Sequence, residues 1–176
     1  SNGNLIVAAR LNGDLSLDSS FNPDGTPQGV LQTTVGAMTT AFDTTIFADN
    51  RIMIVGGNTS QTAPYMCRVY GDEYVSLVPQ NPTLGIAGHC DYTLDIPNYY
   101  FNLNALGAGA LNNSSANVIL TLPNGKQYVV FDNGTVSKLV RLTEGSNSAP
   151  ALDTTFQTDG IADATALSGA SSIFID

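Results

Sequence analysis

The fold is decided by the stretch LTLPNGKQYVVF, residues 120–131. It joins two apolar runs through the dipeptide Asn124-Gly125. Asn followed by Gly accepts the positive φ angles of a tight hairpin turn, and β-branched and aromatic residues beside such a turn favour strands. The stretch therefore predicts a β-hairpin.

The same framing of short apolar runs by turn residues recurs along the chain. Such runs lie at Leu5–Ala9, Ile52–Val55 and Val118–Leu120. Four more tight-turn dipeptides separate them: Asn12-Gly13, Asp24-Gly25, Asn133-Gly134 and Asp159-Gly160. No long segment has a convincing helical stripe with caps. We therefore expect residues 1–176 to form a single all-β domain.

The composition excludes several classes of protein. Only 12% of the 176 residues are charged while 43% are hydrophobic, the opposite of a disordered chain. The net charge is −9 and the six basic residues are scattered, so neither nucleic acid nor an anionic membrane surface is an expected partner. No apolar run approaches the roughly 18 residues of a membrane span. The chain begins Ser1-Asn2-Gly3, without Met or a basic n-region, so we expect a signal peptide to be absent or already removed and the start to be a processed mature end or an excised fragment.

The chain repeats itself at a distance. Leu17-Asp18-Ser19-Ser20-Phe21 recurs as Leu152-Asp153-Thr154-Thr155-Phe156, and an Asp-Gly turn follows each copy. Arg10-Leu11 precedes the first copy and Arg141-Leu142 precedes the second. We name each copy an Arg-Asp-Phe motif. An Asp followed by Ser or Thr is suited to an Asx-turn that caps its own backbone, and the Phe is expected in the core.

A middle unit has the strands without the Leu-Asp motif. It begins with Ile52–Gly57 and continues with Cys67–Tyr70. Three degenerate antiparallel β-sheet repeats follow from this pattern, over residues of about 1–49, 50–124 and 125–176.

These motifs resemble the delta-60 repeat family, bacterial tandem repeats thought to form β-propeller blades. Leu5–Gly25 and Lys126–Gly160 match the family pattern, and the middle unit matches half of it. The resemblance implies propeller-blade-like sheets and an extracellular or cell-surface setting. It implies no activity.

An insertion from Tyr74 to Gly125 departs from this pattern. Its only charged residues are Asp91 and Asp95, and it is rich in tyrosine. Three interpretations stay open: a subunit contact, since interface centres are poor in charge and rich in aromatics; extra strands and core cover within the domain; and a ligand groove lined by tyrosines.

No catalytic, cofactor or metal site is expected. His89 and Cys90 are adjacent, so on a strand they point to opposite faces and do not form a nucleophile pair. The repetition of Asp18 and Asp153 in equivalent places argues against paired glycosidase carboxylates. The oxygen-rich loops at Asn22–Gly25 and Asp132–Gly134 are expected to be plain β-turns rather than calcium loops. Cys67 and Cys90 form a disulfide or remain two buried thiols.

Two functional classes remain. The first is a non-enzymatic structural protein that assembles at or outside the cell surface. The second is a carbohydrate- or ligand-binding adhesion module of a larger secreted protein, with a glycan as partner.

The chain ends favour the first class. Leu5, Ile6 and Val7 at the start and Ile173, Phe174 and Ile175 at the end are expected to be apolar strands that need partners. Written end to start, they read as the two strands of one hairpin. Pairing between subunits would give a homo-oligomer or a filament; self-closure and a longer repeat chain are the alternatives.

Overall fold

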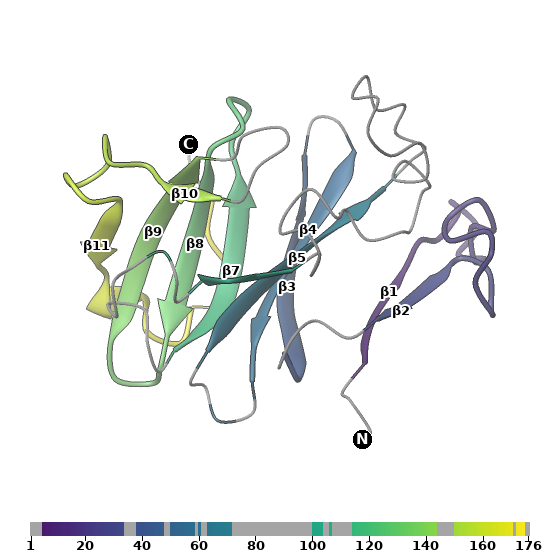
Figure 1. Ribbon diagram of the computed structural model, residues 1–176, viewed down its shortest axis with the longest axis horizontal. Helices are drawn as coiled ribbons and strands as arrows, with labels where there is room; N and C mark the ends of the chain where they lie inside the picture. The colour runs from purple at the N-terminus through teal and green to yellow at the C-terminus, as the bar shows by residue number, and fades with distance from the viewer. Residues whose placement is uncertain are drawn as a thin grey trace.

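The computed structural model contains three antiparallel sheets and no α-helix among the residues that it describes, which are 5–33, 38–47, 50–58, 60, 63–71, 100–103, 106, 114–143, 150–170 and 172–174. The expected all-β class with three sheets is confirmed. Figure 1 shows the sheets side by side, with the middle one between the other two. We call them the N-terminal, middle and C-terminal sheets.

The sheets follow one another along the chain. The N-terminal sheet pairs β1 (Ile6–Ala9) with β2 (Val30–Thr33). The middle sheet has the order β3-β4-β5-β6, with bounds Thr40–Ile46, Arg51–Gly57, Pro64–Tyr70 and Tyr100–Asn102. The C-terminal sheet has the order β10-β9-β8-β7, and β11 also pairs with β9. Its strands are β7 (Ser115–Thr121), β8 (Gln127–Asp132), β9 (Ser137–Thr143), β10 (Ala151–Leu152) and β11 (Ile161–Asp163). A short 3-10 helix, η2 (Thr165–Leu167), follows.

Two hairpins have the same construction. β3 pairs with β4 and β7 pairs with β8 with one register shift each, between Ala41 and Asp43 and between Ala116 and Val118. Four residue pairs then lead to the turn in both hairpins. The Asn-Gly turn predicted at residues 124–125 is confirmed, with Gly125 at φ 79°.

The sheet boundaries differ from the expected repeat units. Boundaries near 49/50 and 124/125 fall inside the turns of these two hairpins, so β3 and β7 belong to the sheets that follow them. A hairpin cannot be divided between sheets because its two strands share their backbone hydrogen bonds. The insertion also contributes β6 and β7, with Leu103 and Ala116 fully buried, so its described part supplies strands and core. Tyr74, Tyr92 and Tyr99 lie outside the described residues.

The two central strands of the middle sheet, β4 and β5, are buried on both faces. One core lies against the C-terminal sheet and joins Met53, Val55 and Met66 to residues such as Val129 and Phe131. The other lies against the N-terminal sheet; its members are Ile6, Phe21, Leu31, Met38, Ile54, Tyr65, Cys67 and Val69. Because side chains alternate along a strand, two apolar faces require the nearly continuous apolar runs of β4 and β5.

The middle and C-terminal sheets also meet through polar groups. Asp43 on β3 accepts a hydrogen bond from the Ile119 amide at 2.9 Å, and the Thr45 hydroxyl accepts one from the Thr121 amide at 3.3 Å. These two amides belong to β7, the last strand of its sheet. Side chains of the middle sheet thus accept hydrogen bonds from backbone amides at the edge of the C-terminal sheet.

Gly57 allows the close approach of these sheets. A Cβ at Gly57 would stand 2.6 Å from the Cβ of Ser115, which is fully buried. We expect Gly57→Ala to lower the free energy of unfolding by about 1–3 kcal/mol, because overpacking forces the strands apart. Urea denaturation measures the loss. Gly13→Ala, whose Cβ would meet nothing within 4 Å, is the matched control and should stay within about 0.5 kcal/mol of wild type; equal effects of the two changes would contradict this packing.

Candidate functional site

The first Arg-Asp-Phe motif is a closed hydrogen-bonded unit. Asp18 accepts the Ser20 amide at 3.0 Å and the Ser20 hydroxyl at 2.6 Å, and pairs with the Arg10 Nε at 2.8 Å. The Phe21 amide donates to the Asp18 carbonyl at 3.0 Å, and the Gly29 amide donates to the Phe21 carbonyl at 2.7 Å. Arg10 stacks over the Phe21 ring at 5.4 Å.

The second motif repeats these contacts. Asp153 accepts the Thr155 amide at 3.1 Å and the Thr155 hydroxyl at 2.6 Å, and pairs with the Arg141 Nε at 2.7 Å. The Phe156 amide donates to the Asp153 carbonyl at 2.9 Å, and the Gly160 amide donates to the Phe156 carbonyl at 2.7 Å. Arg141 stacks over the Phe156 ring at 4.9 Å. Both arginines also reach beyond their own loops: Arg10 donates to the Gly71 carbonyl, and Arg141 donates to the Tyr128 hydroxyl at 3.3 Å.

The two phenylalanines differ in burial. Phe21 is 1% exposed, whereas Phe156 is only partly buried. Phe21 therefore lies in the core as expected, whereas the Phe156 ring is only partly covered. Phe156 lies on the outer side of the C-terminal sheet, where Tyr128 meets it edge to face at 5.5 Å. From the sequence alone, no role was expected for Arg10, Arg141 or Tyr128. The Arg-Leu pair before each Leu-Asp was the signal that could have pointed to the two arginines.

A lysine distinguishes the two aspartates. Lys126, the last residue of the β7–β8 turn, pairs with Asp153 at 2.6 Å, and the Asp153 side chain is 4% exposed. The Asp18 side chain is 23% exposed. Hydrogen bonds from Lys126 and then Thr155 lower the pKa of Asp153 well below its usual range. The Ser20 hydroxyl is the main group that lowers the pKa of Asp18.

Other residues singled out in the sequence lie apart from these motifs. Cys67 is buried on β5, while His89 and Cys90 lie outside the described residues, so the disulfide stays a prediction. In the described part of the chain, no group of three or more His, Cys, Asp or Glu side chains is arranged to hold a metal ion. No helix within those ranges has the length and apolarity needed to cross a membrane.

The expected C-terminal strand does not form within residues 172–174. Ile173 and Phe174 have no strand pairing, Phe174 is 83% exposed, and Ile175 lies outside the described residues. An apolar sequence becomes a strand only beside a partner edge, and none of the described strands pairs with this segment.

The N-terminal strand has a different register from the one expected. The Arg10 amide donates to Gly29 and the Arg141 amide donates to Gly160, so β1 corresponds to β9, the strand that follows a hairpin. The pairs Ala9–Val30 and Val140–Ile161 agree with this register. The reading of the chain end and start as one continuous hairpin is therefore wrong, because a strand corresponding to β8 would stand between them. Leu5, Ile6 and Val7 are still at the start of an apolar strand, and Ile6 is buried.

One edge of β1 has no partner among the described strands. Since Arg10 turns its amide toward β2, the alternation of an antiparallel pair turns the amides of Val7 and Ala9 to the opposite edge. The counterpart edge of β9 pairs with β8.

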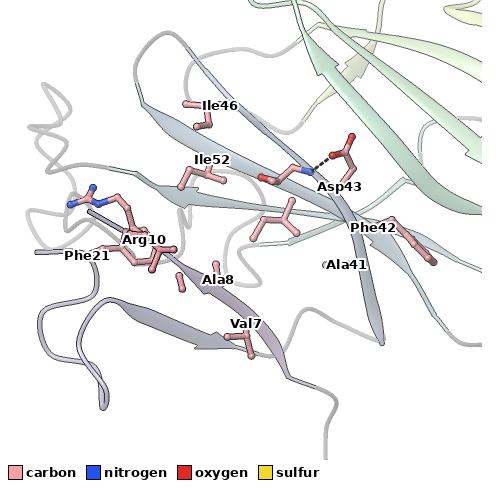
Figure 2. Close-up of a pocket in the computed structure, with 13 residues that line it drawn as sticks. Val7, Ala8, Arg10, Phe21, Ala41, Phe42, Asp43, Ile46 and Ile52 are labelled. Atoms are coloured by element: carbon pink, nitrogen blue, oxygen red, sulfur yellow. Dashed lines mark hydrogen bonds between the residues drawn. The ribbon is translucent and has the colours of Figure 1, made fainter. Parts of the chain in front are cut away.

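An apolar groove lies beside this edge. It has a volume of about 530 Å³ and is lined by β1, by Phe21, and by residues of β3 and β4 that include Ile52 and Ile54. Figure 2 shows Val7, Ala8 and Arg10 on one side and Ala41 and Phe42 on the other. We call this the β1 groove.

The lining of the β1 groove is largely exposed. Val7 is 59% exposed, Ile46 65% and Phe42 45%. Large apolar side chains gathered beside unpaired backbone groups suit an extended peptide, which can pair with the edge and bury the side chains together. The sequence did not indicate this groove, because β1 and β3 are separated by 30 residues in the chain.

No protein-family model, curated protein or solved structure matches this chain. The candidate site is therefore defined by the geometry of the chain itself.

The low pKa of Asp153 predicts acid sensitivity. A carboxyl group whose pKa is lower in the folded chain than in the unfolded chain stabilises the fold above the unfolded value of about 4, and this contribution is lost as the pH falls below it. We expect wild type to lose more thermal stability between pH 5 and pH 2.5 than Asp153→Asn does. Asp24→Asn, which changes an exposed aspartate, should follow wild type. A variant and wild type with parallel pH profiles would show that the Asp153 interactions do not stabilise the fold.

Proposed function

We propose that this protein is a non-enzymatic structural β-repeat protein that self-associates through its terminal segments at or outside the cell surface. The observation that carries the proposal is the apolar edge of β1, with which no described strand pairs, together with the groove beside it. A sheet edge of this kind adds strands from other chains unless it is blunted. The resemblance to delta-60 repeats supports the extracellular setting and a propeller-like stacking of sheets.

The repeated contacts support a building block rather than an enzyme. The carboxylates of both Arg-Asp pairs, whose pKa values are lowered, are engaged in ion pairs and hydrogen bonds within the fold. Such pairs hold successive strands in register. A motif that closes a loop in the same way in the N-terminal and C-terminal sheets is suited to an assembling protein.

The chemistry of the groove favours protein over sugar as partner. Its lining is mainly aliphatic and aromatic, with Arg10, Asp43 and Thr44 as the polar members. Asp43 is already bonded to the Ile119 amide. Sugars require many hydrogen-bonding groups, whereas an added strand requires a free backbone edge and apolar cover.

Self-association is tested by light scattering after size exclusion. We expect wild type to exceed the 18.4 kDa of one chain and its mass to rise with concentration. Val7→Lys, which places a charge on the exposed face of β1, should return the protein to one chain, because burying an unpaired charge opposes the contact. Leu15→Lys changes an equally apolar residue outside the groove and should assemble like wild type.

A wild-type mass of 18.4 kDa at every concentration would refute self-association. Equal effects of the two lysine substitutions would mean that the contact does not use β1.

The C-terminal segment is tested separately. Deleting residues 172–176 should weaken or abolish assembly, because this apolar segment includes the exposed Phe174. The deleted chain should keep its circular dichroism spectrum, since residues 172–174 belong to no strand. Unchanged assembly would remove the C-terminal segment from the contact and leave β1 as the only terminal element involved.

A further inference from the structure

We propose that the β1 groove is the acceptor site for one two-stranded β-hairpin of a neighbouring chain, with a basic residue at the end of its turn. This inference rests on the proposed function, because self-association and hairpin binding would use the same edge of β1. It adds the kind of segment that binds there. In the C-terminal sheet, the β7–β8 hairpin occupies the corresponding place.

The N-terminal sheet matches part of the C-terminal sheet. β1 corresponds to β9 and β2 to β11, as the pairs Ala9–Val30 and Val140–Ile161 show. In the C-terminal sheet, β9 continues into β8 and then β7, which form a hairpin. The N-terminal sheet has no described strand at these two places.

The β1 groove occupies the place of that hairpin. The β7–β8 hairpin packs on the middle sheet through Ala116, Ile119 and Val129. The opposite face of the middle sheet presents Ile46, Ile52 and other apolar groups of β3 and β4 to the groove. One hairpin would therefore pair with β1 through its second strand and cover these side chains with both strands.

Asp18 indicates the charge of the partner. Its counterpart Asp153 is paired with Lys126, which ends the turn of the β7–β8 hairpin, and is almost fully buried. Asp18 has the equivalent partners Arg10 and Ser20, in place of Arg141 and Thr155, but is more exposed. Arg51 occupies the position of Lys126 in the β3–β4 turn. A basic residue at this position of an added hairpin would lie beside Asp18.

The closest available probe is the hairpin of residues 115–132 from this chain. A fluorescein-labelled peptide of this sequence is titrated against the full-length protein and followed by fluorescence anisotropy. We expect saturable binding with one peptide per chain. Lys126→Gln in the peptide should weaken binding about fivefold toward wild type, but have little effect toward Asp18→Asn, as a charge pair requires. A scrambled peptide is the control.

Edge pairing is tested with Ala9→Pro, which removes an amide directed at the free edge. We expect at least tenfold weaker binding, with the thermal unfolding of the protein unchanged. If that variant fails to fold, Ile46→Lys places a charge in the groove without altering β1 and should weaken binding equally.

A covalent version removes any dependence on the folding of the free peptide. Asn2-Gly3 precedes Arg10 by the same spacing that places Asn133-Gly134 before Arg141. Residues 115–132 are therefore fused ahead of Asn2 in the full chain. We expect slowed hydrogen exchange at the Val7 and Ala9 amides, compared with a fusion that carries the scrambled hairpin.

Equal exchange in the two fusions, or equal binding of intact and scrambled peptides, would overturn the proposal. Saturation of the groove by an intact second chain but not by the hairpin would also overturn it, while supporting self-association. Hairpin binding by a protein that stays monomeric would support the acceptor site and refute self-association.

Discussion

The burial of β4 and β5 on both faces is the constraint on which the rest of the structure depends. Met53 and Val55 pack toward the C-terminal sheet while Ile54 and Cys67 pack toward the N-terminal sheet. Each fully buried aliphatic side chain contributes about 1.5–3 kcal/mol. Removal of either neighbouring sheet would expose the apolar cluster on that side of the middle sheet. A sheet that needs cover on both faces cannot be the last in a stack. The outward faces of the two outer sheets must therefore be covered or exposed in a different way from those of the middle sheet.

The two outer sheets end the stack differently. The C-terminal sheet covers its outer side with its own loops, where Phe156, Tyr128 and Arg141 pack together and the Gly169 amide donates to Asp132 at 2.6 Å. The N-terminal sheet has two described strands and leaves Val7 more than half exposed. The Arg-Asp-Phe motif is the same at both ends, because it closes the loop between two adjacent strands. The difference lies in the hairpin that accompanies only the C-terminal copy.

Much of this fold could be predicted from the sequence, since its signals are local. The Asn124-Gly125 turn, the apolar run of β4 and the Asx-turns at Asp18 and Asp153 depend on residues within a few positions of one another. The register of β1 was predicted wrongly from its short Ile-Val-Ala run, although Arg10 and Arg141 stand at equivalent places before the two motifs. The bonds from Arg10 to Gly29 and from Arg141 to Gly160 show that β1 corresponds to β9. The β1 groove could not be predicted. It exists between β1 and β3, which no local pattern connects.

The edges of the sheets differ in how their free amides are treated. On β7, the amides of Ile119 and Thr121 are bonded to Asp43 and Thr45, so this edge is closed to further strands. Natural sheets also protect edges with proline, lysine or inward charges. β1 consists of Ile, Val and two Ala residues and has none of these devices. Because the same chain protects one edge with specific side chains, the unprotected β1 edge is not a general property of its sheets. An apolar edge that has none of these devices and is bordered by an apolar groove is suited to acceptance of a strand.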